Sequence, residues 1–388
     1  MSPVNRRSVR SSFNGLFGRA LKKIEVFILK RKIRTLSNGT NFLPFNFKAK
    51  WSAGMRAMVL TEHGDMDKLV YRSDYPDPKP GPGQAIIKVG ACSLNYHDVF
   101  TRRGMPGIKV PFPVIIGLDV AGEIVELGEG IEGWSVGDRV LINPIDPKRG
   151  LTGEMFDGGL AEFFLANESQ LIRMPDGVSF AQAAALPVAY GTAHRMMFTN
   201  GDIQKGDKVL VLGASGGVGT CCVILAKMAG CEVVVGASSQ EKIDRLKNLG
   251  ADWGINYEEE AFEKAIFAKY GKPHRRTFDG GVDVVVNFTG GETWVPSFKA
   301  LKRGGKVLTC GATAGYDPKT DIRYIWTFEL KVLGSNSWTV QDLESLMQMI
   351  EDGRMNPPID RIYSLEEAGE ALRVIEDREV FGKVIVQP

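Results

Sequence analysis

The stretch KVLVLGASGGVGTCCVILAKMAG, residues 208–230, constrains the fold of this chain more than any other feature. An apolar run enters a glycine-rich turn, and a helical pattern begins directly after it. In such a unit, backbone N–H groups at the helix N-terminus point to where a pyrophosphate can bind. The first glycine of the usual G-x-G-x-x-G pattern is Ala214 here, but the two later glycines remain. Because another apolar run follows the helix, the stretch predicts nucleotide binding, in preference to an ordinary turn. The expected contacts are Ser215, Gly216, Gly217, Val218 and Gly219.

The residues after the second apolar run, CEVVVG at 231–236, indicate which nicotinamide cofactor binds. An NAD-dependent enzyme places an acidic residue there to accept a hydrogen bond from the ribose 2′-OH. This chain has Ser238 and Ser239, with Lys242 one helical turn further on. Two hydroxyls and a cation suit a 2′-phosphate, so we expect NADP(H). The alternative is that Lys242 and Arg245 are only the solvated face of a surface helix.

The pattern of apolar runs divides the chain into two kinds of structure. From about residue 179, apolar runs alternate with amphipathic helices such as 240–250, which predicts a parallel sheet covered on both faces. Residues 55–175 contain short β-like runs broken by Gly and Pro, which predict a small barrel-like β unit. The chain is expected to end with two helices, the first opened by a capping-box spacing from Thr339 to Asp342, and a β run at 382–388. A length of 388 residues agrees with two domains in an α/β fold.

The first 54 residues differ in composition from the rest of the chain. They carry twelve Lys or Arg and one acidic residue, Glu25, so the remainder has a net charge of 2 − 11 = −9. A body this acidic argues against nucleic-acid binding. The extension is either a removable leader or the result of a start assigned too early, with Met55 as the true beginning. We expect a cytoplasmic protein; a transit peptide would instead indicate a mitochondrial one, and an amphipathic helix a membrane surface.

Many ordered motifs resemble the medium-chain dehydrogenase/reductase superfamily and, within it, the zinc-independent quinone oxidoreductase-like branch. They include GPGQAIIKV at 81–89, SLNYHDVFTRRG at 93–104, GLDVAGEIVELGEG at 117–130, NLGAD at 248–252 and FGKVIV at 381–386. The resemblance covers nearly all of residues 55–388. It implies a GroES-like β-barrel domain formed by residues 55–178 and 326–388, with a Rossmann doubly wound parallel-sheet domain at 179–325 between them. It also implies a homodimer and a substrate cleft where the two domains meet.

The resemblance also raises the question of zinc. The family's zinc enzymes have a Cys where this chain has Asn95, and a His-Glu pair where it has Leu118 and Asp119. The lobe that holds their structural zinc reads NPIDPKRGLTGEMFDGG here and contains no Cys. These side chains do not supply the N and S ligands that zinc prefers, so we expect no metal site. His97 and His194 keep a narrow alternative open, although two histidines without a third ligand more often serve as hydrogen-bonded core residues.

Without zinc, a substrate that accepts hydride readily is favoured. In a conjugated carbonyl compound, hydride adds at carbon β and the charge spreads into an enolate or hydroquinone. The hydride chemistry belongs to the cofactor, and the protein mainly orients it. The expected activity is therefore NADPH-dependent reduction of a quinone, an enone or an enoyl thioester.

The resemblance also suggests site residues. Asn95 would lie near the nicotinamide and hydrogen-bond the acceptor's oxygen. Asp98 would lie close by or would orient the SLNYHD loop. Tyr96 or Tyr190 would donate a proton or line the pocket. The resemblance also suggests Tyr257 and Lys383 as cofactor contacts. Thr289, Gly311, Ala312 and Thr313 are expected as further contacts because they follow predicted strand ends, where open α/β folds bind ligands. The segment VNFTGGETW, 286–294, departs from the branch and leaves the acceptor open.

Two further hypotheses remain. One is an alcohol or aldehyde dehydrogenase that uses His97 or a tyrosine where zinc would act. The other is a protein that binds NADP without turnover or associates with a membrane through residues 1–54. Metal content, oxidation of a saturated alcohol, and removal of the extension would separate them.

Overall fold

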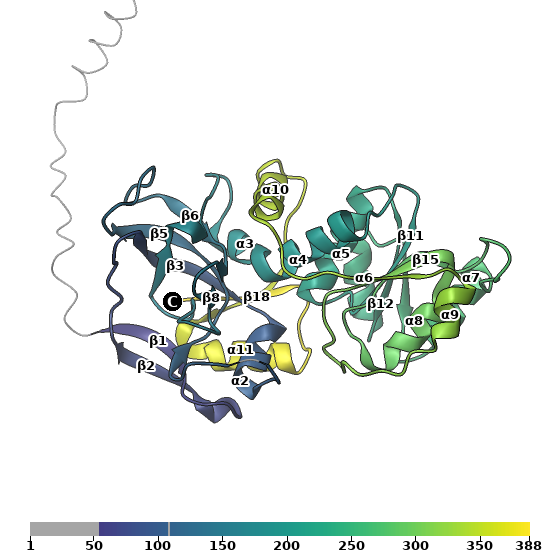
Figure 1. Ribbon diagram of the computed structural model, residues 1–388, viewed down its shortest axis with the longest axis horizontal. Helices are drawn as coiled ribbons and strands as arrows, with labels where there is room; N and C mark the ends of the chain where they lie inside the picture. The colour runs from purple at the N-terminus through teal and green to yellow at the C-terminus, as the bar shows by residue number, and fades with distance from the viewer. Residues whose placement is uncertain (1–53, 108) are drawn as a thin grey trace, which may run out of the picture. The chain divides into compact units, whose positions relative to one another are not determined.

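The computed structural model describes residues 54–107 and 109–388 (Figure 1). The predicted basic extension therefore lies outside the described residues, apart from Gly54. Within the described part of the chain, no helix combines the length and apolar character needed to cross a bilayer.

The predicted parallel sheet has six strands. They are β13 (Trp253–Asn256), β12 (Glu232–Ala237), β11 (Lys208–Leu212), β14 (Val282–Val286), β15 (Leu301–Thr309) and β16 (Lys331–Gly334), in this spatial order. Every pairing between neighbours is parallel. The order reverses direction between β11 and β14, and open α/β sheets bind ligands at the carboxyl ends of strands beside such a point. This is the Rossmann arrangement expected from the sequence.

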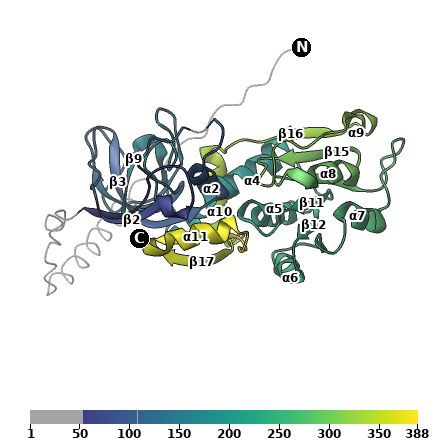
Figure 2. The ribbon, with the colours of Figure 1, turned by 90° about the horizontal axis from the view of Figure 1, so that it is seen from below.

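Helices cover both faces of this sheet because successive strand residues point to opposite sides. Val209 and Val211 share a buried cluster with residues of α5 (Gly217–Met228) and α6 (Gln240–Asn248). Leu210 and Leu212 pack instead with α7 (Phe262–Tyr270) and α8 (Trp294–Ala300). Figure 2 shows these helices around the strands. The continuous apolar strands are therefore buried on both sides, as the alternation of runs and helices predicted.

The second structural unit is a β domain with its own core. Its largest sheet has the order β10 (Leu171–Arg173), β6 (Arg139–Ile142), β5 (Asp119–Leu127), β3 (Gln84–Leu94), β18 (Lys383–Gln387) and β17 (Ile359–Ser364), and β9 (Phe163–Asn167) also pairs with β3. A smaller sheet joins β2 (Leu69–Tyr75), β1 (Met55–Leu60) and β4 (Val114–Ile115), and β7 (Ile145–Asp146) pairs with β8 (Gly150–Leu151). The last strand of the chain thus lies beside β3, far earlier in the sequence. This pairing brings Lys383 next to the end of β3.

Further helices connect or cover these sheets. The segment 180–200 begins with α3 (Phe180–Ala184) and continues through α4 (Thr192–His194). Helix α10 (Val340–Glu351) begins at Thr339, whose side chain accepts from the backbone of Asp342, so the capping box predicted there is present. Helix α11 (Ala368–Glu376) joins β17 to β18.

The structure corrects the sequence analysis in three places. The domain boundary at residue 326 is too early, because it cuts α9 (Ile322–Thr327) and because β16 is the sixth strand of the parallel sheet. The SLNYHD segment is not a loop throughout, since α2 (Tyr96–Arg103) begins within it. The short β-like runs expected within 55–175 include 114–127, which forms two strands, β4 and β5, because Gly117 has a φ of +100°.

Candidate cofactor site and active site

The glycine-rich loop has the geometry of a phosphate site. It leaves β11 at Gly213, with φ +66°, and reaches Gly216, which caps α5 with extended dihedral angles. No side chain caps this helix, so its first N–H groups are available to a ligand. A Cβ built on Gly216 would have Gly213 O as its nearest neighbour, at 3.7 Å, so the surface there is open on the ligand side. Ser215, Gly217 and Val218 complete the turn and the start of the helix.

Gly219 has a different function from Gly216. A Cβ at this position would lie 2.6 Å from Ala214 Cα and would also clash with the carbonyl oxygen of Gly213. Helix α5 therefore approaches the end of β11 at a distance that only glycine permits. This contact fixes the helix N-terminus over the strand and so fixes the direction in which its N–H groups point.

The C-terminal strand joins this loop directly. The backbone N–H of Gly382 donates to Ser215 O over 2.8 Å, and Gly382 and Gly216 form an isolated β-bridge. A Cβ on Gly217 would lie 2.8 Å from Lys383 Cδ. Lys383, predicted from the resemblance to lie near the cofactor, is therefore placed directly against the phosphate loop.

A second group of predicted residues lies where β12 and β13 end. Ser238 and Ser239 are half-buried, and the Ser239 hydroxyl accepts from the backbone N–H of Lys242 over 3.3 Å at the start of α6. Tyr257 is 41% exposed, and its backbone N–H donates to Ala237 O over 3.2 Å. The arrangement places two hydroxyls, a phenol and an ammonium at the position of the adenosine ribose in this fold.

Sequence reasoning missed the segment that faces Lys242. Lys242 Nζ donates to the carbonyl oxygen of Arg378 over 3.1 Å, in the turn between α11 and β18. The guanidinium of Arg245 stacks over Phe381 at 3.9 Å from the ring centroid and contacts Asp360 at 3.5 Å. Lys242 and Arg245 are therefore not only a solvated face, because both contact the segment between β17 and β18. No motif in the sequence signals this pairing, since more than a hundred residues separate the partners.

The ends of β14 and β15 supply the remaining predicted residues. Asn287 is fully buried, and its Oδ1 accepts from the backbone N–H groups of Thr289 and Gly290, each over 3.0 Å. Thr289 Oγ1 lies 3.1 Å from the Cβ position of Gly213, so this loop adjoins the phosphate loop. Residues 311–313 lie beside it, and the N–H of Thr313 donates to Phe288 O over 3.3 Å. Gly311, Ala312 and Thr313 are thus brought to the same edge of the sheet as Thr289.

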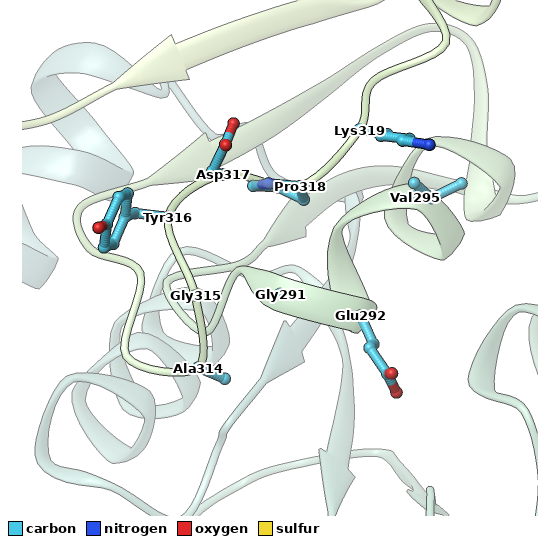
Figure 3. Close-up of a pocket in the computed structure, with 9 residues that line it drawn as sticks. All are labelled: Gly291, Glu292, Val295, Ala314, Gly315, Tyr316, Asp317, Pro318 and Lys319. Atoms are coloured by element: carbon cyan, nitrogen blue, oxygen red, sulfur yellow. The ribbon is translucent and has the colours of Figure 1, made fainter.

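Two open hollows lie further along this edge. One, of about 620 Å³, is bordered by Glu292, Tyr316, Asp317 and Lys319 among others (Figure 3). Another, of about 590 Å³, is lined in part by Gly311 and Ala312. Neither is lined by the phosphate loop, Asn95 or Lys383. We therefore locate the site by its polar groups and not by these hollows.

A buried polar cluster lies under the phosphate loop in the β domain. Lys383 Nζ donates to Asn95 Oδ1 over 2.5 Å and to Leu94 O over 3.0 Å, and lies 3.5 Å from Asp119 Oδ2. Asn95 Nδ2 donates to Asp119 Oδ2 over 2.8 Å. Asp119 Oδ1 in turn accepts from the backbone of Val188 over 3.0 Å. The exposed fractions are 7% for Asn95, 2% for Lys383 and 0% for Asp119, so the cluster is largely shielded from water.

Asp98 holds this cluster in place from one side. Its Oδ2 accepts from the backbone N–H of Asn95 over 2.8 Å in a capping box at the start of α2, and its Oδ1 accepts from Gly117 N over 3.1 Å. Burial raises the pKa of the Asp98 carboxyl to about 6, against the backbone hydrogen bond that favours the charged form. Both oxygens are engaged, so Asp98 orients the loop before α2, the structural alternative that the sequence left open.

Burial also moves the pKa of the ion pair toward the neutral forms. It raises the pKa of Asp119 and lowers that of Lys383, while the attraction between the two charges opposes both shifts. The proximity of opposite charges is what makes a buried ammonium and carboxylate tolerable here.

The family's zinc does not fit this cluster. An amide, an aliphatic side chain and a carboxylate stand at Asn95, Leu118 and Asp119, and the Lys383 ammonium contacts two of them. A cation bound among these residues would be repelled by that ammonium. Within residues 54–107 and 109–388, no three His, Cys, Asp or Glu side chains are arranged to hold a metal ion. The residues present therefore do not match a zinc site.

The other candidate side chains are placed apart from this cluster. Tyr190 is 0% exposed, with its hydroxyl 3.5 Å from Thr220 Oγ1 of α5. Tyr190 is therefore a packing residue of the buried cluster around α5, and the expectation that it donates a proton is wrong. His194 Nδ1 contacts Asp342 Oδ1 over 2.7 Å. Tyr96 packs edge-on against Phe100.

His97 lies closer to the site. Its side chain is 29% exposed, and Nε2 contacts Glu154 Oε2 over 2.5 Å. Burial opposes its charge, but the hydrogen bond and charge of Glu154 outweigh burial and raise the pKa of His97. This pair is a partly exposed, proton-holding group on α2, the helix that Asn95 caps.

Comparison with known proteins gives two domain matches. The family model described as "Alcohol dehydrogenase GroES-like domain" matches residues 81–176, and the one described as "Zinc-binding dehydrogenase" matches residues 217–352. Together they cover most of the β domain and of the parallel-sheet domain.

Three relatives match over most of their length. A crotonyl-CoA reductase of Streptomyces avermitilis is 30% identical, with 88% of each chain covered. An acryloyl-coenzyme A reductase of Sulfurisphaera tokodaii is 33% identical, covering 86% of this chain and 100% of the relative. A quinone oxidoreductase of Mus musculus is 31% identical, covering 86% of this chain and 97% of the relative.

Two solved structures place this fold among dinucleotide enzymes. One, described as an NAD-dependent alcohol dehydrogenase, has a TM-score of 0.78 at 33% identity and covers 86% of this chain and 100% of its own. The other is the 2-octenoyl-CoA carboxylase reductase CinF in complex with NADP and 2-octenoyl-CoA, with a TM-score of 0.76 at 26% identity, covering 87% of this chain and 88% of its own.

Proposed function

Because the chain belongs to the medium-chain dehydrogenase/reductase superfamily, we propose that it is an NADPH-dependent oxidoreductase that transfers hydride to a conjugated carbonyl compound without zinc. The acceptor classes are a quinone, an enone or an enoyl thioester. The observation that carries the proposal is the Asn95–Lys383–Asp119 cluster, which stands at the family's zinc position and adjoins the phosphate loop.

The residues fit the cofactor. The uncapped start of α5 and the open surface over Gly216 suit a pyrophosphate. Ser238, Ser239, Lys242 and Tyr257 suit a ribose 2′-phosphate better than a 2′-hydroxyl. They offer hydroxyl donors and a cation where an NAD-dependent enzyme has an acidic residue. When bound, the reduced nicotinamide supplies the hydride.

The substrate class follows from what the cluster can do. A zinc ion stabilises an alkoxide and polarises a carbonyl as a Lewis acid. An amide donor is weaker, and it suits a substrate whose developing charge is delocalised over a conjugated system. The names of the relatives support this class, since two reduce enoyl thioesters and one reduces quinones. We assign the donor to Asn95, with its amide directed at the carbonyl oxygen, and the orientation of its backbone to Asp98.

His97 supports a second candidate, an alcohol or aldehyde dehydrogenase. Its partly exposed imidazole contacts Glu154, which raises the pKa of His97, and it lies on α2, the helix that Asn95 caps. Such a group could protonate an alkoxide directly. The two candidates differ in substrate: the second oxidises saturated alcohols, and the first does not.

For assembly and compartment we propose a homodimer in the cytoplasm. The dimer is supported by β16, an edge strand with Val332 42% exposed, and by the nearby exposed side chains of Ile322 and Trp326. A reducing compartment is supported by five cysteines without a disulfide among them. Scattering on the purified protein and fractionation of cells expressing it would test the two statements. The alternatives of a mitochondrial or membrane-bound protein depend on residues 1–54, and a truncated chain that changes location would favour them.

The full-length protein should be assayed for NADPH and NADH oxidation against a quinone, an enone, an enoyl thioester and a saturated aldehyde, with metal content measured on the same sample. We expect NADPH oxidation with the conjugated acceptors only. Asn95→Ala should reduce turnover, while the exposed Asn248→Ala serves as the matched control and should not. Activity confined to the saturated aldehyde, or stoichiometric zinc, would contradict the proposal. Cofactor binding without turnover would favour a non-catalytic NADP-binding protein.

A further inference from the structure

The Lys383 ammonium faces three acceptors within the protein. It donates to Leu94 O and Asn95 Oδ1 and faces Asp119 Oδ2 at 3.5 Å. An ammonium has three donors and no acceptor, and these three acceptors match that number. At 2% exposure, Lys383 is buried, with its ammonium directed at these protein groups. Its effect on a substrate is therefore expected to pass through a neighbour.

The neighbour most affected is the Asn95 amide. Its Oδ1 accepts from Lys383, and its Nδ2 donates to Asp119. The flipped amide would place its NH₂ against the ammonium and its oxygen against the carboxylate, so two donors would face each other and two acceptors would do the same. An amide orientation is assigned from such a network, and this network permits only one.

This orientation leaves one amide hydrogen unused. Nδ2 carries two hydrogens, and Asp119 accepts one of them. Within residues 54–107 and 109–388, the other has no partner. In the flipped orientation, the cluster would instead leave a carbonyl lone pair there, which would repel a substrate oxygen.

The same lysine is fixed relative to the cofactor loop. The preceding residue, Gly382, donates to Ser215 O over 2.8 Å, and Lys383 Cδ lies against Gly217. The loop before α5 is thus bonded to the backbone of Gly382, and the Asn95 amide to the ammonium of the next residue, Lys383. The pairing of Val384 with Leu94 fixes the backbone of β18 beside the residue that precedes Asn95.

We propose that Lys383 is a positioning residue, which together with Asp119 holds the Asn95 amide so that its free N–H points at the substrate's carbonyl oxygen, at a fixed distance from the phosphate loop. The inference rests on the proposed function and deepens it. When carbon β receives a hydride, the π electrons move onto that oxygen, and the enolate then takes a proton from water. The Asn95 N–H meets the oxygen as its charge grows, and Lys383, hydrogen-bonded to the other end of the amide, strengthens that donor.

A double-mutant cycle on the full-length protein tests this. Asn95→Ala should lower kcat for an enone about 100-fold, as loss of one oxyanion donor does. Lys383→Met should lower it about 10-fold, and the double variant should be no slower than roughly 100-fold, because the lysine acts only through the amide. The Kd for NADPH should change by less than about twofold, since the Gly382–Ser215 hydrogen bond is retained. Lys306→Met, which removes a lysine bonded to Asp202 O, serves as the matched control and should leave kcat unchanged.

The outcomes separate the inference from the proposed function. A wild-type protein without turnover refutes the proposed function. Wild-type turnover with a roughly 1000-fold loss in the double variant, the product of the single losses, refutes the positioning role. If Lys383→Met does not fold, Lys383→Met/Asp119→Asn removes both charges together and should show the same dependence on Asn95. Failure of that variant to fold would also overturn the proposal, because it would assign the pair to holding β18 against β3.

Discussion

Replacement of each of two glycines by alanine should separate cofactor binding from stability. A Cβ on Gly219 would lie 2.6 Å from Ala214 Cα and closer still to Gly213 O, whereas ordinary contact begins near 3.4 Å. The backbone must therefore move by at least 3.4 − 2.6 = 0.8 Å. Both groups belong to main chain, and no flexible side chain can give way. Overpacking of this kind costs about 1–3 kcal/mol in the free energy of unfolding. The shift also tilts the start of α5, so Gly219→Ala should lose NADPH affinity as well.

Gly216→Ala is the matched comparison. Its φ of −79° suits any residue, and the nearest atom to the new Cβ is 3.7 Å away. The free energy of unfolding should therefore stay within about 0.5 kcal/mol of the wild type. The methyl group faces the space that the pyrophosphate needs, so the Kd for NADPH should rise about tenfold or more.

Urea unfolding and NADPH titration by fluorescence, on both variants, would measure the two quantities. We expect Gly219→Ala to lose both stability and NADPH affinity, and Gly216→Ala to lose NADPH affinity alone. Unchanged NADPH affinity in Gly216→Ala would refute the assignment of this loop to the pyrophosphate. Unchanged stability in Gly219→Ala would refute the close approach of α5 to β11.

Three other changes have defined outcomes. Lys242→Ala should lower kcat/KM for NADPH about tenfold and leave NADH nearly unchanged in steady-state assays, since only NADPH carries the 2′-phosphate; an equal loss with both cofactors would contradict this. Burial raises the pKa of Asp98 from 3.8 to about 6, so the folded state binds the proton more tightly than the unfolded state does. The stability that this tighter binding gives is present below pH 3.8 and is lost as pH rises through 6. The stability difference between the wild type and Asp98→Asn should therefore fall by roughly 3 kcal/mol from about pH 4 to about pH 7, and a pH-independent difference would show that Asp98 titrates normally. Arg102 is 1% exposed and pairs with Glu376, so Arg102→Met should lower the free energy of unfolding in urea by about 3 kcal/mol. The double variant Arg102→Met/Glu376→Leu should recover most of this loss. Equal losses in both variants would contradict the ion pair.

The sequence predicted those parts of the site that depend on local pattern. The Gly213–Gly219 loop, the strand before it and α5 follow from a strand-turn-helix signal within about twenty residues. Ser238, Ser239 and Thr289 were predicted because each follows an apolar run that becomes a parallel strand, and carboxyl ends of parallel strands meet at one edge. Their proximity is thus a consequence of topology, which the alternation of runs and helices reveals.

The contacts of Lys383 could not be read in this way. Its partners Asn95 and Asp119 lie more than 260 residues earlier. The antiparallel pairings of β18 with β3 and of β3 with β5 bring them together. The sequence placed Lys383 near a cofactor by resemblance but gave no sign of its charge partners. The same limit explains the contact between Lys242 and Arg378.

Other errors have local causes. Tyr190 lies in an apolar segment, and an isolated tyrosine gives no signal that distinguishes a buried hydroxyl from one facing a substrate. The boundary at residue 326 came from the resemblance and not from the pattern of apolar runs, and it falls before β16, a short edge strand exposed at Lys331, Val332 and Gly334. Helix α2 was missed because its eight residues include five polar or charged ones.

The most direct test of hydride transfer to a conjugated carbonyl without zinc uses NADPH deuterated at the transferred position. The full-length protein, treated with a chelator and analysed for metal, would be incubated with an enone or enoyl thioester that it reduces, and the product examined by NMR. The account predicts one deuterium at carbon β, a saturated carbonyl product and a rate unaffected by the chelator. Deuterium at the carbonyl carbon, or activity lost on chelation and restored by zinc, would contradict it.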